Sequence, residues 1–216
     1  CRIMARVVSR RPGGQAKSIS QPTRFLIVGR EGTRELGEYL AQFLYVRGNH
    51  VDRLLGFDHV QRVSTYQLGI NETGPWTSLA HGVDLVIGLN NSSIDFEAHL
   101  NMDGTLLLDA SLVTTSPSTE DIEIVSVPST TLAQAALATA PVRPDGLDYQ
   151  DLVGAVIFGA ALSVILQYPE TAELNQLFVR YHRPPVLPLV LATHIGYDWL
   201  QDRQMRGKSL TLGVKE

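Results

Sequence analysis

The chain has 216 residues, of which 44% are hydrophobic and 19% are charged. A chain of this length forms one sizeable domain or two small ones, so a disulfide-stapled miniprotein is excluded. No run approaches the roughly 20 uninterrupted apolar residues of a membrane-spanning helix, and we expect no membrane span. The one cysteine, Cys1, cannot by itself supply a disulfide, a tetrathiolate zinc site or an iron–sulfur cluster, so any such centre must belong to a partner.

The formal net charge of −4 conceals a basic N-terminal arm. Residues 1–24 contain no acid and carry six basic side chains, namely Arg2, Arg6, Arg10, Arg11, Lys17 and Arg24. The rest of the chain holds 12 of the 18 basic side chains and all 22 acidic ones, a net of −10, which argues against general nucleic-acid binding. We expect a basic arm over 1–24 that docks on a partner or is a solvated tail, an α/β domain over 25–206, and a tail or linker over 207–216.

The segment after the arm predicts a strand, a glycine turn and a helix. An apolar run from Arg24 to Val28 ends at Gly29, and Gly32 follows where a helical pattern begins. Apolar residues then recur at three- and four-residue intervals, at Leu36, Leu40, Phe43 and Leu44. Gly48 is expected to end this helix. A second extended run over 50–55 follows at once, so this region is predicted to be a βαβ unit.

Further strands are predicted at 64–70, 83–89, 104–109 and 122–127, with a short helix at 94–100. After Pro128, Ser129 is expected to cap an alanine-rich helix that ends near Thr139. The last third is predicted to be helical over 152–166, 169–178 and 188–205. Small residues in the first of these helices, Gly154 and Gly159 among them, would let another backbone approach closely. The predicted fold class is α/β, a Rossmann-like βαβ sheet domain with a helical C-terminal third.

The turn Gly29-Arg-Glu-Gly-Thr-Arg34 is the strongest local signal for a ligand site. A strand that feeds a helix through glycines presents backbone N–H groups and the positive end of the helix to an anion. The turn is not the GxGxxG motif of dinucleotide-binding proteins, because Glu31 and Arg34 stand where glycines are required and the Glu31 carboxylate would repel a pyrophosphate. Two interpretations stay open: a site for an anion or nucleotide, and a turn kept tight only for packing.

Other polar groups support less specific interpretations. Asn90-Asn91-Ser92-Ser93 either contacts a polar ligand or caps the following helix, and Asp84 either contacts a neighbouring loop or marks the start of its strand. No two of the six histidines have the i, i+4 spacing that puts metal ligands on one helical face, so no metal site is expected. No serine has a nucleophile-elbow context, and Cys1 has no visible activating group, so no catalytic residue is predicted.

The order of these features resembles the gamma subunit, or gamma domain, of the 2-oxoacid:ferredoxin oxidoreductases over about residues 24–200. The matching segments are Phe25–Gly32, Ser64–Asn71, Gly82–Leu89, Asp103–Asp109, Val127–Ala133, Gly154–Leu162 and Ala192–Tyr197. The departures fall on the family's glycine and polar positions. Its first turn reads GxGGxG, of which Gly29 and Gly32 remain, and its next loop reads Arg-Gly-Gly, where this chain has Gln61-Arg62-Val63. Two asparagines of the family correspond to Gly154 and Leu189.

The resemblance implies a gamma-type subunit of a cytoplasmic complex that oxidatively decarboxylates a 2-oxo acid, forms an acyl-coenzyme A and reduces ferredoxin. It implies catalytic alpha- and beta-type subunits as partners, which bind thiamine diphosphate, magnesium and the iron–sulfur clusters and pass electrons to ferredoxin. No cofactor is assigned to this chain itself. Its expected contributions are assembly of the complex and, at the coenzyme A channel, phosphate-positioning groups at Gly29, Arg30, Gly32, Thr33 and Arg62.

Two alternatives to this function are kept. The first is a free-standing nucleotide-dependent Rossmann-like enzyme, in which Asp52 or Asp58 would bind the ribose near the end of the second strand. The second is a purely structural scaffold subunit that binds no ligand. Calorimetric titration with coenzyme A and with nicotinamide dinucleotides separates the three.

Overall fold

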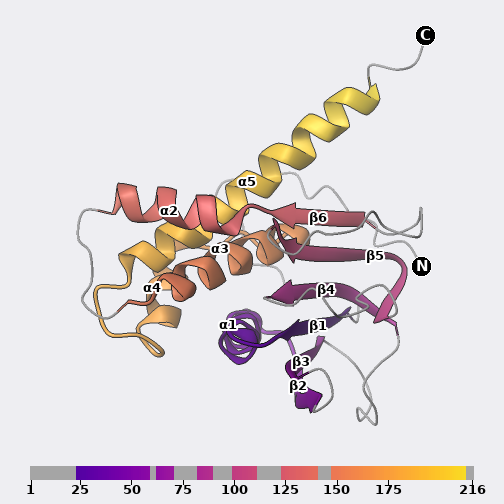
Figure 1. The fold of residues 1–216 in the computed structure, drawn as a ribbon, viewed down its shortest axis with the longest axis horizontal. Helices are drawn as coiled ribbons and strands as arrows, with labels where there is room; N and C mark the ends of the chain where they lie inside the picture. The colour runs from indigo at the N-terminus through magenta and orange to yellow at the C-terminus, as the bar shows by residue number, and fades with distance from the viewer. Residues whose placement is uncertain are drawn as a thin grey trace. The chain divides into compact units, whose positions relative to one another are not determined.

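The computed structural model describes residues 23–58, 62–70, 82–89, 99–110, 123–140 and 147–212 (Figure 1). The expectations for the arm over 1–22, for Asn90–Ser93 and for a helix over 94–98 lie outside these residues. The chain divides into two compact units, Cys1–Val127 and Pro128–Glu216, and each is described by itself.

The first unit contains one sheet and one long helix. Its elements are β1 (Thr23–Gly29), α1 (Thr33–Val46), β2 (Val51–Asp58), β3 (Val63–Ile70), β4 (Val83–Leu89), β5 (Leu100–Asp109) and β6 (Glu123–Val127). The sheet has the strand order β2-β3-β1-β4-β5-β6. β1, β4, β5 and β6 run parallel, whereas β3 is antiparallel to both β1 and β2. The predicted α/β class is confirmed.

The predicted βαβ unit is split by β3, which lies between β1 and β2. Only four residues, 59–62, separate β2 from β3. A parallel crossover needs about a dozen residues or more, so the chain turns back and pairs antiparallel. β5 begins at Leu100, four residues before its predicted start at 104. The helix predicted over 94–100 is therefore wrong at Leu100, which lies in this strand.

One face of this sheet is covered by α1. The helix buries Leu36, Leu40 and Leu44, the apolar positions that predicted it. Gly37 permits close approach, because a Cβ built there would fall on the ring of Tyr66 in β3. The helix ends as predicted at Gly48, which has a positive φ of 82° and donates its N–H to the carbonyl of Tyr45. The opposite face carries an apolar cluster that includes Leu26, Val28, Val86, Leu106 and Leu108.

The second unit is helical, with α2 (Ser129–Thr139), α3 (Tyr149–Val164), α4 (Thr171–Phe178) and α5 (Leu187–Leu212). Ser129 was predicted to cap α2. It is instead the first residue of the helix, and Pro128 holds the cap position. α3 begins three residues before its predicted start. Asp148 accepts the N–H of Gln150, and Asp151 accepts the N–H of Asp148, so a capping box fixes this helix start.

α3 and α5 pack with their backbones in close contact. A Cβ on Gly159 would fall on the carbonyl of Thr193, and one on Gly196 would fall on the carbonyl of Val156. The predicted role of small residues is therefore confirmed at Gly159. It does not hold at Gly154, where an added Cβ would meet no atom within 4 Å.

Candidate functional site

The carboxyl ends of β1 and β4 meet where the strand order of the sheet reverses. β1 is bordered by β3 on one side and by β4 on the other, and Gly29 pairs in register with Leu89. In open α/β sheets, ligands bind in the crevice outside such a switch point. The glycine turn singled out in the sequence follows β1 at this position.

Both glycines of the turn are required by local geometry. A Cβ on Gly29 would lie 2.6 Å from the carbonyl oxygen of Leu89, so no side chain fits there. Gly32 has a left-handed backbone with a φ of 73°, which favours glycine, and it is exposed. These constraints bring the chain from β1 into α1 within three residues.

The N-terminus of α1 has no side-chain cap among the described residues. Gly32 holds the cap position, and its carbonyl accepts the N–H of Leu36 at 3.0 Å. A helix start leaves its first N–H groups without intrahelical partners, and the helix dipole favours an anion there. The turn therefore offers N–H donors and a positive field, which suit a phosphate group.

The hydroxyl of Thr33 lies at the base of this turn. The residue is 2% exposed, and Oγ1 has no hydrogen-bond partner among the described residues. Oγ1 lies 3.0 Å from the position that a Cβ on Gly29 would take, so it faces the end of β1. A buried hydroxyl without a partner costs about 1–3 kcal/mol, and such a group at a ligand edge is a donor available to a bound oxygen.

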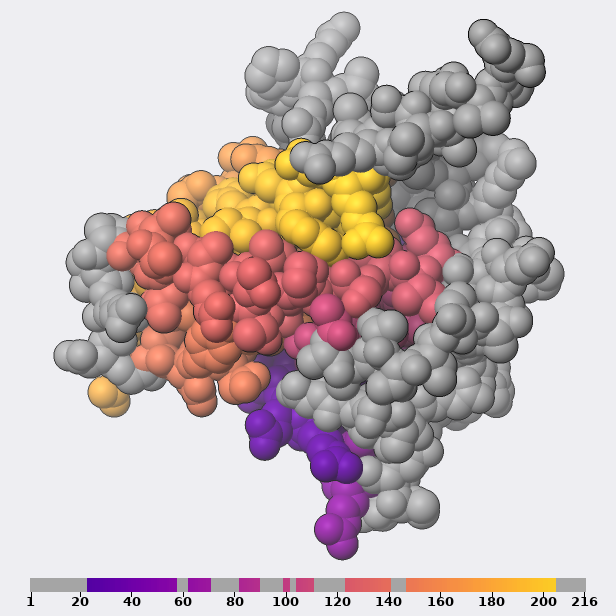
Figure 2. All heavy atoms as spheres, turned by 45° about the horizontal axis from the view of Figure 1, so that its top comes forward, coloured from indigo at the N-terminus to yellow at the C-terminus, as the bar shows by residue number. Residues whose placement is uncertain are grey.

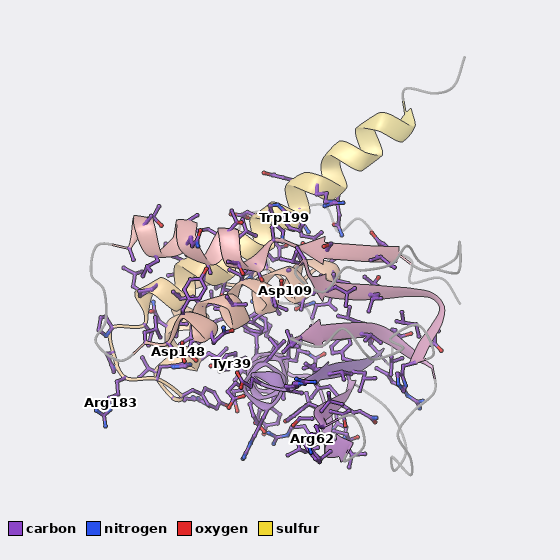
Figure 3. All side chains as sticks on the ribbon, in the orientation of Figure 1. Tyr39, Arg62, Asp109, Asp148, Arg183 and Trp199 are labelled. Atoms are coloured by element: carbon purple, nitrogen blue, oxygen red, sulfur yellow. The ribbon has the colours of Figure 1, made fainter. Side chains whose placement is uncertain are left out.

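Charged side chains surround the turn, all exposed: Arg30, Glu31, Arg34, Glu35 and, from the β2–β3 connection, Arg62. Ser64 lies opposite Gly29, so Arg62 stands at the same edge of the sheet (Figure 3). The turn and Arg62 carry three guanidinium groups and two carboxylates, a net of +1 beside the turn, although Glu31 opposes a phosphate and Asp109 adds a carboxylate two strands away. The structure thus gathers Gly29, Arg30, Gly32 and Thr33 in one turn and puts Arg62 one strand away.

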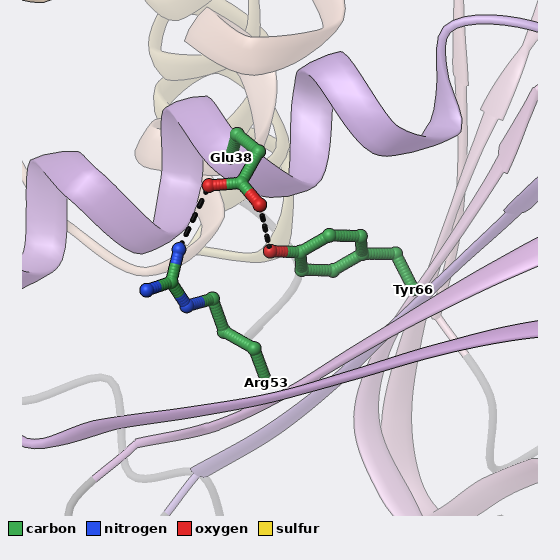
Figure 4. Close-up of polar contacts among 3 residues, drawn as sticks. All are labelled: Glu38, Arg53 and Tyr66. Carbon is green, nitrogen blue, oxygen red and sulfur yellow. Dashed lines mark hydrogen bonds and ion pairs between the residues drawn. The ribbon is translucent and has the colours of Figure 1, made fainter.

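A polar cluster that sequence reasoning missed holds α1 on the sheet (Figure 4). The Glu38 carboxylate accepts one hydrogen bond from Arg53 Nη1 and another from the Tyr66 hydroxyl, each at 2.8 Å. Burial, with the neighbouring Glu38 carboxylate, raises the pKa of Tyr66 well above its usual range, so the phenol stays a donor. In the sequence, Glu38 stands outside the apolar positions of the helix, and nothing near it indicates Arg53 or Tyr66 as partners. We assign the cluster to orienting α1 because its groups lie along the helix rather than at its N-terminus.

Two aspartates lie at opposite ends of the strands, Asp84 near the start of β4 and Asp109 at the end of β5. Asp84 lies within β4 near its start and accepts hydrogen bonds from the backbone N–H of Arg24 and from Asn101 Nδ2, at 2.9 and 3.0 Å. The interpretation that Asp84 marks the start of its strand therefore fits, whereas the expected contact with a loop is wrong, because both partners lie in the neighbouring strands β1 and β5. Asp109 ends β5 at the ligand edge and is 5% exposed (Figure 3). It lies two strands from Gly29, or about 10 Å at the usual strand spacing.

The position of β3 disfavours the dinucleotide-enzyme alternative. Because β3 intervenes, the end of β2 at Asp58 lies two strands from Gly29, about 10 Å, instead of the about 5 Å of adjacent strands. Through the register of β3, Asp52 lies beside Arg24 near the start of β1, whereas the glycine turn follows the end of β1. Neither acid stands where a ribose ligand next to the first turn is expected.

Within the described ranges, no three histidine, cysteine, aspartate or glutamate side chains gather as metal ligands. The described helices, the 26-residue α5 included, contain no stretch long and apolar enough to cross a membrane.

No protein-family model and no curated protein matches the sequence. Solved structures do resemble it. The gamma subunit of keto/oxoacid ferredoxin oxidoreductase from Geobacter sulfurreducens has a TM-score of 0.61 and 15% identity, over 83% of this chain and 99% of that one. Subunit PORC of pyruvate oxidoreductase from Thermotoga maritima has a TM-score of 0.59 and 15% identity, over 82% of this chain and 96% of that one.

A third similar structure is 2-oxoglutarate:ferredoxin oxidoreductase from Magnetococcus marinus, determined with 2-oxoglutarate, coenzyme A and succinyl-CoA bound. It has a TM-score of 0.60 and 13% identity, over 85% of this chain but 32% of that longer one. The resemblance predicted from ordered motifs is thus matched in three dimensions: this chain has the fold of the gamma subunits of oxoacid:ferredoxin oxidoreductases.

Proposed function

We propose that the chain is a gamma-type subunit of a 2-oxoacid:ferredoxin oxidoreductase complex and that its β1–α1 turn positions a phosphate group of coenzyme A. The complex would oxidatively decarboxylate a 2-oxo acid, transfer the acyl group to coenzyme A and pass the electrons to ferredoxin. The fold shared along 99% of the Geobacter gamma subunit and 96% of subunit PORC supports the subunit assignment.

One observation carries the coenzyme proposal, namely the uncapped start of α1 beside the buried Thr33 hydroxyl at the switch point. The amide groups of the first turn and the hydroxyl are donors, whereas a phosphate is an acceptor with negative charge. Arg30 and Arg62 would supply positive charge from the rim. Glu31 is the one group in the turn that works against the anion.

The chain's own donor set does not suit the redox cofactors of such a complex. One cysteine cannot hold an iron–sulfur cluster, which needs several thiolates. We therefore assign thiamine diphosphate, magnesium and the clusters to alpha- and beta-type partner subunits. Coenzyme A would bring the acceptor thiol, and this chain would bind and orient its phosphates without moving a proton.

Calorimetric titration of the full chain with coenzyme A tests the ligand assignment. We expect binding that Thr33→Ser retains and Thr33→Val weakens, because serine keeps the hydroxyl and valine keeps only the shape. NAD⁺ is the comparison ligand. Binding of NAD⁺ in preference to coenzyme A would revive the dinucleotide enzyme, and binding of neither would favour a ligand-free scaffold.

A further inference from the structure

Apolar side chains are exposed along β2. Leu54, Leu55 and Phe57 are 38%, 54% and 53% exposed, and Tyr45 and Val46 at the end of α1 are 66% and 59% exposed. These five make up half of the large apolar side chains exposed in the described part of the chain. In the space-filling view, atoms with the purple colours of β2 and β3 form the lower tip of the visible surface (Figure 2). Leu54 lies on one face of the strand and Leu55 and Phe57 on the other, so both faces of β2 carry exposed apolar side chains, which are typical of interaction surfaces.

The same strand is the edge of the sheet. Among the described strands, β2 pairs with β3 alone, and it lies at the end of the strand order (Figure 1). A long apolar edge strand presents backbone N–H and C=O groups to any other strand that can align with it. β2 has 8 residues and no proline, so no position lacks a backbone N–H for pairing, and its three charged residues, Asp52, Arg53 and Asp58, restrict the registers in which it can pair.

We propose that β2 pairs antiparallel with β2 of a second copy of this chain, around a two-fold axis perpendicular to the sheet. The two six-stranded sheets would then form one continuous sheet, with the α1 helices of both copies on the same face. This interface is additional to the proposed function and does not depend on coenzyme binding.

Charge selects both the partner and the register. A two-fold axis perpendicular to the sheet keeps each side chain on its own face of the sheet, so residues that face each other must be separated by an even number of sequence positions. Only two such registers pair seven residues of β2. The register centred on Leu55 places Asp52 opposite Asp58 of the other copy, twice, which is unfavourable. The register centred on Leu54 brings no like charges together and places His50 opposite Asp58. The strand is therefore complementary to itself in one register.

That register also buries the exposed side chains. Arg53, Leu55 and Phe57 lie on the face that α1 covers, because Arg53 reaches Glu38 of that helix. Leu55 would lie opposite Arg53 of the other copy, and Phe57 opposite Val51. On the other face, Leu54 would meet its own counterpart. Each exposed apolar residue of β2 would thus gain a cross-strand neighbour.

The mass of the full chain in solution, measured by light scattering during size-exclusion chromatography, tests the proposal. We expect a dimer that Leu54→Glu converts to a monomer, with the dissociation constant raised at least about ten-fold, since Leu54 faces its own counterpart and the change would bring two carboxylates directly opposite each other. Leu166→Glu is the matched control, because Leu166 is a comparably exposed leucine (41%) outside β2 and should leave the dimer intact. A monomeric wild-type chain, or a dimer unaffected by Leu54→Glu, would overturn the proposal.

A disulfide experiment tests the register without relying on destabilisation. In a Cys1→Ser background, Leu54→Cys places two thiols on the axis, where facing Cα atoms are about 4.5–5.5 Å apart and a disulfide can form. Asp52→Cys, two residues away on the same face, places the thiols about 13 Å apart along the strands. Oxidative dimerisation of the first variant and not the second supports this register. Equal cross-linking of both, or of neither, contradicts it.

Discussion

Thr33→Val should make the free protein more stable and at the same time a poorer ligand binder. The Thr33 hydroxyl is 2% exposed and has no hydrogen-bond partner among the described residues. A buried polar group in that state costs about 1–3 kcal/mol, and valine replaces it with a methyl group of the same shape. Threonine and valine have nearly equal helix propensities, so α1 itself contributes little to the difference. We expect the free energy of unfolding to rise by about 1–3 kcal/mol.

The coenzyme A affinity should move in the opposite direction. A hydrogen bond to a charged group contributes about 1.5–3 kcal/mol, which corresponds to an affinity about 10- to 150-fold weaker when the donor is removed. Thermal unfolding followed by circular dichroism measures the first effect, at about 2–4 °C in Tm for each kcal/mol in a chain of this size. Calorimetry measures the second. A Thr33→Val protein that is less stable than wild type would refute the reasoning, because it would mean that the hydroxyl already has a partner in the free protein.

Three further predictions follow from the packing and the pKa values. Gly154→Ala should stabilise α3 by about 0.5–1 kcal/mol because the added Cβ meets open space, whereas Gly159→Ala should cost about 1–3 kcal/mol or more. Tyr66→Phe should cost about 1.5–3 kcal/mol, since it removes a hydrogen bond to a carboxylate, and Arg53→Met less than about 1 kcal/mol, since its side chain is 53% exposed. Burial lowers the pKa of His194 below its ordinary 6.5, so folding stability should fall as the pH drops below 6.5, and His194→Gln should reduce that fall.

Urea unfolding monitored by circular dichroism measures the stability of the glycine, Tyr66 and Arg53 variants. Repeating it between pH 5 and 8 tests the prediction for His194. Equal effects of the two glycine substitutions would contradict the close backbone contact of α3 and α5. A larger loss for Arg53→Met than for Tyr66→Phe would mean that the ion pair dominates the Glu38 cluster. For the pH profile, a His194→Gln chain that loses as much stability as wild type below pH 6.5 would contradict the role of His194.

Local patterns predicted most of the individual elements. α1 was predictable because its buried residues recur at helical intervals between two glycines that the backbone requires, Gly32 and Gly48. The place of β3 was not predictable from its alternation, because alternation identifies a strand but not its neighbours. The start of α3 was missed although Asp148 and Asp151 have capping-box spacing. The expected cap at Ser129 failed because the helix begins one residue earlier than a cap there would require.

The candidate site was predictable in position but not in its decisive detail. The Gly29 and Gly32 turn was visible in the sequence because glycine marks both close approach and left-handed backbone. The burial of the Thr33 hydroxyl was not, because it depends on β4 bringing Leu89 against the turn from a distant part of the chain. The Glu38 cluster likewise joins three elements, and no single-segment pattern contains it.

The composition and activity of the native complex test the central claim most directly. The full chain, purified from its source under native conditions, should co-purify with subunits that carry thiamine diphosphate and iron–sulfur clusters. That preparation should reduce ferredoxin only when a 2-oxo acid and coenzyme A are both supplied. A chain recovered without such subunits, or a complex whose ferredoxin reduction does not require coenzyme A, would contradict the assignment.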